Sequence, residues 1–160
     1  MRLVYRAFVS VLGAGAIAFA PMGPLRAAQV NQAPPLASIS EVLKGESVEN
    51  PNTAQYVAMR CAALLYVFVQ AIPETDVQRS GQRESLSRRA MSFMLRAQGI
   101  QEKVAPKNAD FKDGFVMGSV KRMEDLYIDQ AVDARARTGH FSSDPIIAAD
   151  AEICGSINPS

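Results

Sequence analysis

Apolar side chains recur every three or four residues along much of this chain, which is the spacing of one face of an α-helix. The clearest stripe lies between Thr75 and Pro106 and consists of Leu86, Ala90, Phe93, Met94, Ala97, Ile100 and Val104. A second stripe, between about Phe111 and Arg137, consists of Phe115, Val116, Val120, Met123, Tyr127 and Ala131. No asparagine-glycine or aspartate-glycine turn separates two alternating runs, as it would in a β-hairpin. The pattern predicts an all-α fold.

The segment 56–72 is apolar on almost every face, and Arg60 and Gln70 are its only strongly polar interruptions. A helix of this kind either lies at the centre of other helices or crosses a membrane. Only nine apolar residues run unbroken from Arg60 to Gln70, whereas about 20 are needed to span a bilayer. We therefore expect a central core helix that ends before Pro73.

Helix-start signals in the sequence predict four main helices, preceded by one short helix over 36–44. Capping side chains, with proline or a glutamine at a favourable position, mark these starts. The expected starts are Asn50-Pro51, Thr75 with Gln78, Asn108 or Asp110, and Asp144-Pro145. The sequence predicts a small helical bundle in a single domain, residues 36–158.

The first 28 residues have the order of a Sec signal peptide. A basic start is followed by fourteen uncharged residues, Ala7 to Ala20, and then by the small residues Ala27 and Ala28. Fourteen residues fall short of a membrane span. Residues 29–35 contain two consecutive prolines and indicate a disordered leader. We expect a bacterial protein that is exported to the periplasm or secreted, with no stable membrane anchor after cleavage.

Two cysteines, Cys61 and Cys154, are the only ones in the chain. An oxidising compartment such as the periplasm allows a disulfide between them to persist. If the helices run alternately up and down, the rise of 1.5 Å per residue places both cysteines at about the same level. The sequence therefore predicts one disulfide between the central and the last helix. A pair of free buried thiols is the alternative.

Charge is divided along the chain. Seventeen basic residues less the three in the signal peptide leave 14, against 16 acidic ones, so the mature protein has a net charge of −2. This balance excludes a strong general attraction to nucleic acid or anionic lipid. The third helix nevertheless carries a basic face, for which we expect an envelope protein or an anionic component as partner. Its residues are Arg83, Arg88, Arg89 and Arg96. The alternative is a solvated surface with ordinary pairs such as Glu84 with Arg88.

Arg60 is the most unusual polar residue, because it interrupts the most apolar helix. A guanidinium group keeps its charge, so a buried one needs a carboxylate or carbonyl groups as partners. We expect a buried ion pair, and the possible partners are Asp125, Asp129, Asp150 and Glu152. A side chain that reaches the surface, or an anion site in a pocket, are the alternatives.

No sequence motif for a metal site, a phosphate loop or haem attachment is present, so we expect no cofactor and no metal. His140 is the single histidine. The main hypothesis is a non-catalytic exported protein of the chaperone-like, inhibitor or immunity type, which binds its partner through the basic face or an apolar groove beside it. The alternative is a small periplasmic hydrolase or transferase that uses His140 with a carboxylate. An imidazole without a carboxylate or hydroxyl partner would argue against the second hypothesis.

Overall fold

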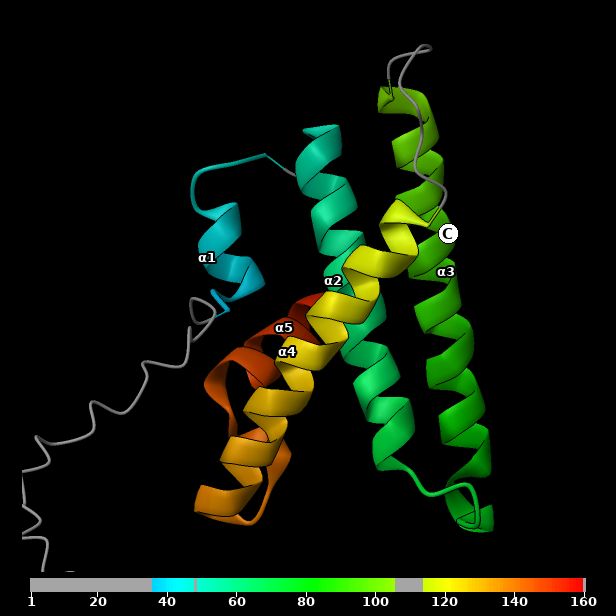
Figure 1. Cartoon of the computed structure of the whole chain (residues 1–160), viewed down its shortest axis with the longest axis vertical. Coiled ribbons are helices and arrows are strands. Elements are labelled where there is room, and N and C mark those ends of the chain that lie inside the picture. Colours follow the sequence, from blue (N-terminus) through cyan, green and yellow to red (C-terminus); the bar gives the residue numbers. More distant parts are fainter. Residues whose placement is uncertain (1–35, 48, 106–113, 160) are drawn as a thin grey trace, which may run out of the picture. The chain divides into compact units, whose positions relative to one another are not determined.

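The computed structural model of the protein describes residues 36–47, 49–105 and 114–159, which belong to one compact unit. The expected signal peptide, residues 1–28, the expected leader, residues 29–35, and the expected caps Asn108 and Asp110 lie outside these residues. The α-helices are α1 (Ile39–Leu43), α2 (Pro51–Ala71), α3 (Ser80–Val104), α4 (Phe115–Thr138) and α5 (Pro145–Ser156), and η1 (Val77–Arg79) and η2 (Phe141–Ser143) are short 3₁₀ helices (Figure 1). The described residues contain no strand, which confirms the all-α prediction.

Helix α2 is the centre of the fold. It contacts α1, α3, α4 and α5, and Figure 1 shows α2 between α1 and α3, with α4 crossing it. Twelve of its 21 residues are buried, among them the run from Val57 to Leu65. The helix is long and apolar enough to cross a membrane, but 61% of its most apolar window is buried inside the structure. Here α2 is enclosed by the rest of the chain, as a core helix is.

Two of the expected helix starts are observed with their capping bonds. The Oδ1 atom of Asn50 accepts a hydrogen bond from the backbone N–H of Asn52, at 2.9 Å, and Pro51 is the first residue of α2. Asp144 accepts from the N–H groups of Ile146 and Ile147 at the start of α5. These bonds satisfy donors that a helix leaves unpaired in its first turn.

The expected capping box at Thr75 and Gln78 is wrong. Asp76 is the cap instead, and it caps η1: its Oδ1 atom accepts from the N–H of Arg79 at 3.1 Å. Its other carboxylate oxygen accepts from the Nε atom of Arg79 at 2.6 Å. A carboxylate that binds both a backbone N–H and a guanidinium outcompetes the neighbouring threonine hydroxyl. The long helix α3 therefore begins at Ser80, five residues after Thr75.

Two other helices begin later than the apolar pattern indicates. Helix α1 starts at Ile39 rather than residue 36, because Ser38 and Glu41 form a capping box. Helix α4 starts at Phe115 rather than Phe111, because Gly114 has a left-handed backbone with φ 93°. Glycine adopts that conformation without the steric cost of a Cβ atom.

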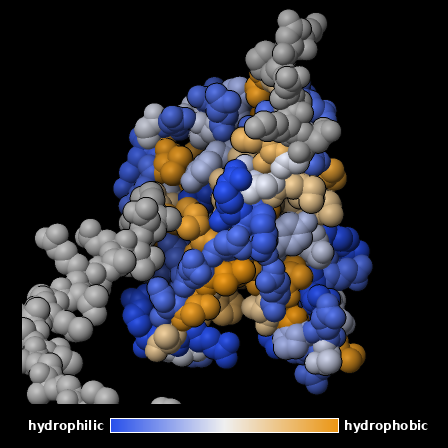
Figure 2. All heavy atoms as spheres, in the orientation of Figure 1, coloured by the Kyte–Doolittle hydropathy of each residue, from blue (hydrophilic) through white to orange (hydrophobic). Residues whose placement is uncertain are grey.

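The core is made of apolar residues from every α-helix, grouped around α2. Partly buried apolar side chains from all five helices pack against it. Polar side chains cover most of the face shown in Figure 2, and apolar side chains gather in its lower middle part. The core thus fixes the position of α3 and α5 relative to α2, on which the candidate site depends.

Candidate functional site

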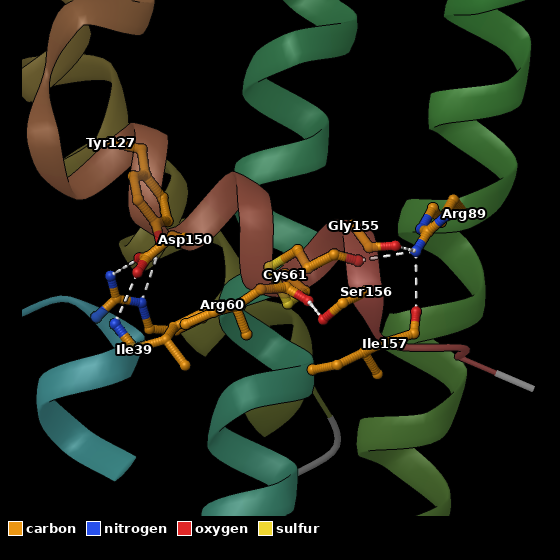
Figure 3. Close-up of a disulfide and its surroundings, with 11 residues drawn as sticks. Ile39, Arg60, Cys61, Arg89, Tyr127, Asp150, Gly155, Ser156 and Ile157 are labelled. Carbon is orange, nitrogen blue, oxygen red and sulfur yellow. Dashed lines mark hydrogen bonds and ion pairs between the residues drawn. A yellow bond between two sulfur atoms is a disulfide. The ribbon is translucent and has the colours of Figure 1, made fainter. Parts of the chain in front are cut away.

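The predicted disulfide is present and joins α2 to α5 (Figure 3). Cys61 and Cys154 are 93 residues apart in sequence, and their Cα atoms are 5.4 Å apart. Both residues are buried, with at most 1% of their surface exposed. The bond lies inside the core, where it fixes the last helix to the central one.

Arg60 is fully buried and forms an ion pair with Asp150, one of the four carboxylates proposed as its partner. Arg60 directly precedes Cys61, and Asp150 lies one helical turn before Cys154. The ion pair and the disulfide therefore connect the same two helices at neighbouring positions (Figure 3). Helices α2 and α5 carry one covalent and one electrostatic connection side by side.

Two tyrosines and a backbone carbonyl supply the remaining acceptors for Arg60. Its Nε atom donates to the hydroxyl of Tyr127 at 2.9 Å, and its Nη1 atom donates to the hydroxyl of Tyr56 at 3.1 Å. The same Nη1 atom donates to the carbonyl oxygen of Ala37, just before α1. The guanidinium thus has acceptors from three parts of the chain besides Asp150.

Asp150 is the acceptor that completes this network. The hydroxyl of Tyr127 donates to its Oδ2 atom, and the N–H of Ile39 donates to its Oδ1 atom at 2.7 Å. Ile39 belongs to α1 and Tyr127 to α4, so α1, α2, α4 and α5 meet at one carboxylate. Both oxygens of this buried carboxylate therefore accept hydrogen bonds from inside the protein.

Two groups of this network, Arg60 and Tyr127, have pKa values shifted upward. Burial, the largest influence, lowers the pKa of Arg60, but Tyr127, Tyr56 and Asp150 raise it by more, so the net shift is upward. Burial is also the main reason why the pKa of Tyr127 is raised, and the charge of Asp150 adds to this rise. Among the described residues, no nitrogen of Arg60 is a buried atom without a partner. The arrangement holds four helices together through buried hydrogen bonds and one ion pair.

Arg89, one of the four arginines of the expected basic face, holds the end of α5. Its Nη2 atom lies 2.8 to 2.9 Å from three carbonyl oxygens, those of Cys154, Gly155 and Ile157 (Figure 3). A cation at the C-terminus of a helix also interacts favourably with the helix dipole. The side chain lies over the ring of Phe93, with 5.9 Å from its guanidinium carbon to the ring centroid.

Arg96 also binds a backbone carbonyl of the C-terminal segment, that of the residue after Ile157. Its Nη1 atom donates to the carbonyl oxygen of Asn158 at 2.9 Å. Arg89 and Arg96 are seven residues apart on α3, so they share one side of the helix. This side faces the end of α5 and is occupied by it in part.

The other two arginines of the expected face lie elsewhere. Arg83 pairs with Glu74 at 2.7 Å, across the turn between α2 and α3. Arg88 pairs with Glu84 on the same helix at 3.1 Å, and its side chain is 73% exposed. The structure thus does not bring the four arginines into one surface: one points outward, two contact the C-terminal segment, and one lies beside the preceding turn.

The outward side of α3 exposes apolar side chains that were not among the predicted site residues. Met91 is 45% exposed and Leu95 is 58% exposed. They lie three and seven residues after Arg88, so the three residues share one side of the helix. The signal was visible in the sequence, because both are large apolar residues that fall outside the stripe predicted to be buried. We call Arg88, Met91 and Leu95 the outer face of α3.

Two pockets border α3 on its other sides. One, of about 260 Å³, is polar and is lined by Val69, Glu74, Ser80, Arg83, Glu84 and Ser87. The other, of about 180 Å³, is mainly apolar and is lined by Ala54, Val57, Ala58, Phe93, Arg96 and Ile157. The first contains the Arg83–Glu74 pair, whereas the second lies between α2, α3 and the residues that follow α5.

His140, the residue of the alternative enzymatic hypothesis, is exposed in the turn before η2. Its backbone carbonyl accepts from the hydroxyls of Thr138 and Ser143. Among the described residues, its imidazole has no hydrogen bond to a carboxylate or hydroxyl. The same residues contain no group of three histidine, cysteine or acidic side chains that could hold a metal ion.

Comparison of this chain with protein-family models, curated proteins and solved structures gives no match.

Proposed function

We propose that the protein is exported and binds a protein of the cell envelope through the outer face of α3. The observation that carries this proposal is the exposure of Met91 and Leu95 beside Arg88. Methionine and arginine are enriched at protein interfaces, and adjacent apolar side chains on one helix side are typical anchors of a binding surface.

Two features support the export part of the proposal. The first 28 residues have the signal-peptide pattern, and the Cys61–Cys154 disulfide is of the kind that persists in oxidising compartments. We further infer that α2, α3, α4 and α5 form a small bundle around α2, which would make the exported domain a rigid support for the outer face.

The charge of α3 supports an acidic partner. The helix carries five basic residues, Arg83, Arg88, Arg89, Arg96 and Lys103, against two acidic ones, Glu84 and Glu102, a net charge of +3. Of the arginines, Arg88 is the one on the outer face. Its ion pair with Glu84 is exposed and therefore weak, so a carboxylate of a partner can replace Glu84 at little cost. The partner we propose presents an amphipathic helix with acidic residues beside an apolar stripe.

The role of Arg89 and Arg96 in this proposal differs from that of Arg88. Both donate to carbonyl groups at or after the end of α5, so substitutions there do not test binding at the outer face. In the described structure, no hydrogen bond joins the side chains of Arg88, Met91 and Leu95 to the end of α5. Substitutions at these three positions separate binding from stability.

The proposal is tested by capture from a periplasmic extract with the immobilised exported protein. We expect Leu95→Glu to remove the captured partner, because it places a charge among apolar anchors and opposes an acidic surface. Val132, 61% exposed on α4, provides the matched control Val132→Glu, which should retain it. Equal capture by the two variants, or a full-length chain whose cysteines stay reactive to alkylation in cells, would refute the proposal.

A further inference from the structure

The apolar pocket between α2, α3 and the C-terminal segment has the composition of a small ligand site. Its floor comes from α2, where Ala54 and Ala58 lie one turn apart on the same side as Val57. The small alanine side chains leave the space, and the buried ring of Phe93 from α3 forms the opposite wall. Such a site lies apart from the outer face of α3 and does not depend on the function proposed above.

We propose that this pocket binds a small carboxylic acid that carries one aromatic ring or one branched alkyl group. The volume, about 180 Å³, sets the size of the apolar part. An engineered apolar cavity of about 150 Å³ in another protein accommodates benzene. A single ring therefore fits, whereas pockets for drug-sized ligands start at about 300 Å³.

Arg96 sets the charge of the ligand. Among the described residues that line the pocket, Arg96 is the only charged one, and it is exposed. Among the described residues, Arg96 forms no ion pair with a carboxylate; its Nη1 atom donates to the carbonyl oxygen of Asn158. A guanidinium group presents several donors in one plane and binds a carboxylate through two of them. An acid with its ring in the pocket would place its carboxylate at this residue.

The C-terminal segment already places an apolar side chain in the pocket and an oxygen acceptor at Arg96. Ile157 lines the pocket with a branched apolar side chain, and the next residue, Asn158, gives its carbonyl oxygen to Arg96. A branched apolar group and an oxygen acceptor thus already lie together at this site. A free acid reproduces that combination with a full negative charge, which binds arginine more strongly than a neutral carbonyl does.

The experiment titrates the exported protein, purified with its disulfide intact, and follows backbone amide resonances by NMR. Phenylacetate is the probe, with acetate and toluene as probes that lack the ring and the carboxylate respectively. We expect phenylacetate to shift the amides of Val57, Phe93 and Arg96 in a saturable way. Acetate should leave them unchanged at the same concentration, and toluene should bind more weakly than phenylacetate.

Two variants and their controls locate the site. Ala54→Leu fills the pocket from a partly exposed position where leucine keeps the helix, so it should abolish the shifts. Arg96→Gln should weaken phenylacetate binding by about tenfold, the loss expected for a charged hydrogen bond, and leave toluene binding unchanged. Ala136→Leu on the exposed side of α4 and Arg88→Gln on the outer face of α3 should bind like the parent protein.

Three outcomes would overturn the proposal. One is the absence of saturable shifts with phenylacetate, and another is unaltered binding by Ala54→Leu. The third is binding of a peptide with a C-terminal phenylalanine while phenylacetate does not bind, which would assign the pocket to protein termini instead. Because no envelope partner enters this experiment, its result does not depend on the proposed role of the outer face.

Discussion

Arg60 and Asp150 form a fully buried ion pair directly beside the disulfide that joins the same two helices. The tyrosine hydroxyl of Tyr127 and the backbone of α1 complete the shell around Asp150. This network accounts for how a charged residue is tolerated in the most apolar helix of the chain. It also sets how the protein should respond to substitution, reduction and alkaline pH.

The buried ion pair gives the first prediction. Arg60→Met or Asp150→Leu alone should lower the free energy of unfolding by about 3 to 5 kcal/mol, because each leaves one buried charge without its partner. The double variant should lose less than the sum of the two, by an interaction energy of about 0.5 to 3 kcal/mol. Urea unfolding monitored by circular dichroism measures these values.

A matched control for that series is Arg88→Gln, which breaks an exposed pair with Glu84. It should change the free energy of unfolding by less than about 1 kcal/mol. If the Arg60 and Asp150 variants lost no more than this control, the network would contribute nothing beyond a surface ion pair.

The disulfide gives the second prediction. Its removal in the double variant Cys61→Ser with Cys154→Ser should lower the melting temperature. On the chain-entropy model, the bridge across a separation of 93 residues contributes about 4 to 5 kcal/mol. Thermal unfolding of the parent protein with and without reductant checks the same point. A melting curve that reductant does not shift would show that the disulfide does not contribute to stability.

Tyr127 gives a prediction about pH. Its raised folded-state pKa means that the folded protein keeps a phenolic proton that the unfolded chain releases above its ordinary value of 10.0. The stabilisation is complete below about pH 10 and decreases as the pH rises further, by up to about 1.4 kcal/mol per pH unit. Urea unfolding at several alkaline pH values measures the slope.

The variant Tyr127→Phe isolates this contribution. It should be less stable than the parent at neutral pH by about 1 to 3 kcal/mol, since Arg60 loses an acceptor and Asp150 a donor. Its free energy of unfolding should decrease less steeply with pH above about pH 10 than that of the parent protein. The pKa of Tyr66 is also raised, by burial and by the charge of Glu124. Tyr66 therefore contributes equally to the pH dependence of stability in both proteins. Identical slopes in the two proteins would contradict the assignment to Tyr127.

Arg89 and Arg88 give the fourth prediction, because they are neighbours with different roles. Arg89→Gln should destabilise the protein by about 1.5 to 3 kcal/mol, as it removes charged hydrogen bonds to three carbonyl groups at the end of α5. Arg88→Gln should be nearly neutral for stability. Chemical unfolding of both variants measures the difference, and equal stabilities would contradict the capping role of Arg89.

The sequence was sufficient for features that follow from local rules. The all-α class, the starts at Asn50 and Asp144 and the disulfide follow from apolar spacing, capping chemistry and the count of cysteines. The capping box of Ser38 and Glu41 follows the same rules and can be read from the sequence. The expected start at residue 36 was placed from the apolar residues instead.

Features that depend on tertiary contacts were beyond such rules. Asp150 was one of four possible partners for Arg60, and the contact depends on how α5 lies against α2. The arginines of α3 were grouped by charge alone, whereas the C-terminal segment separates Arg89 and Arg96 from Arg88. Thr75 was the expected cap, but the carboxylate of Asp76 accepts the N–H of Arg79 in the same turn and is the cap instead.

Site-specific photo-crosslinking in living cells tests most directly whether the outer face of α3 contacts a partner in the cell envelope, as we propose. A photoreactive amino acid at Leu95 of the full-length chain should give one discrete crosslinked product, which weakens when Arg88 is changed to Glu. The same group at Val132 on α4 should give none. Crosslinks of equal yield at both positions, or no product at Leu95, would contradict the account.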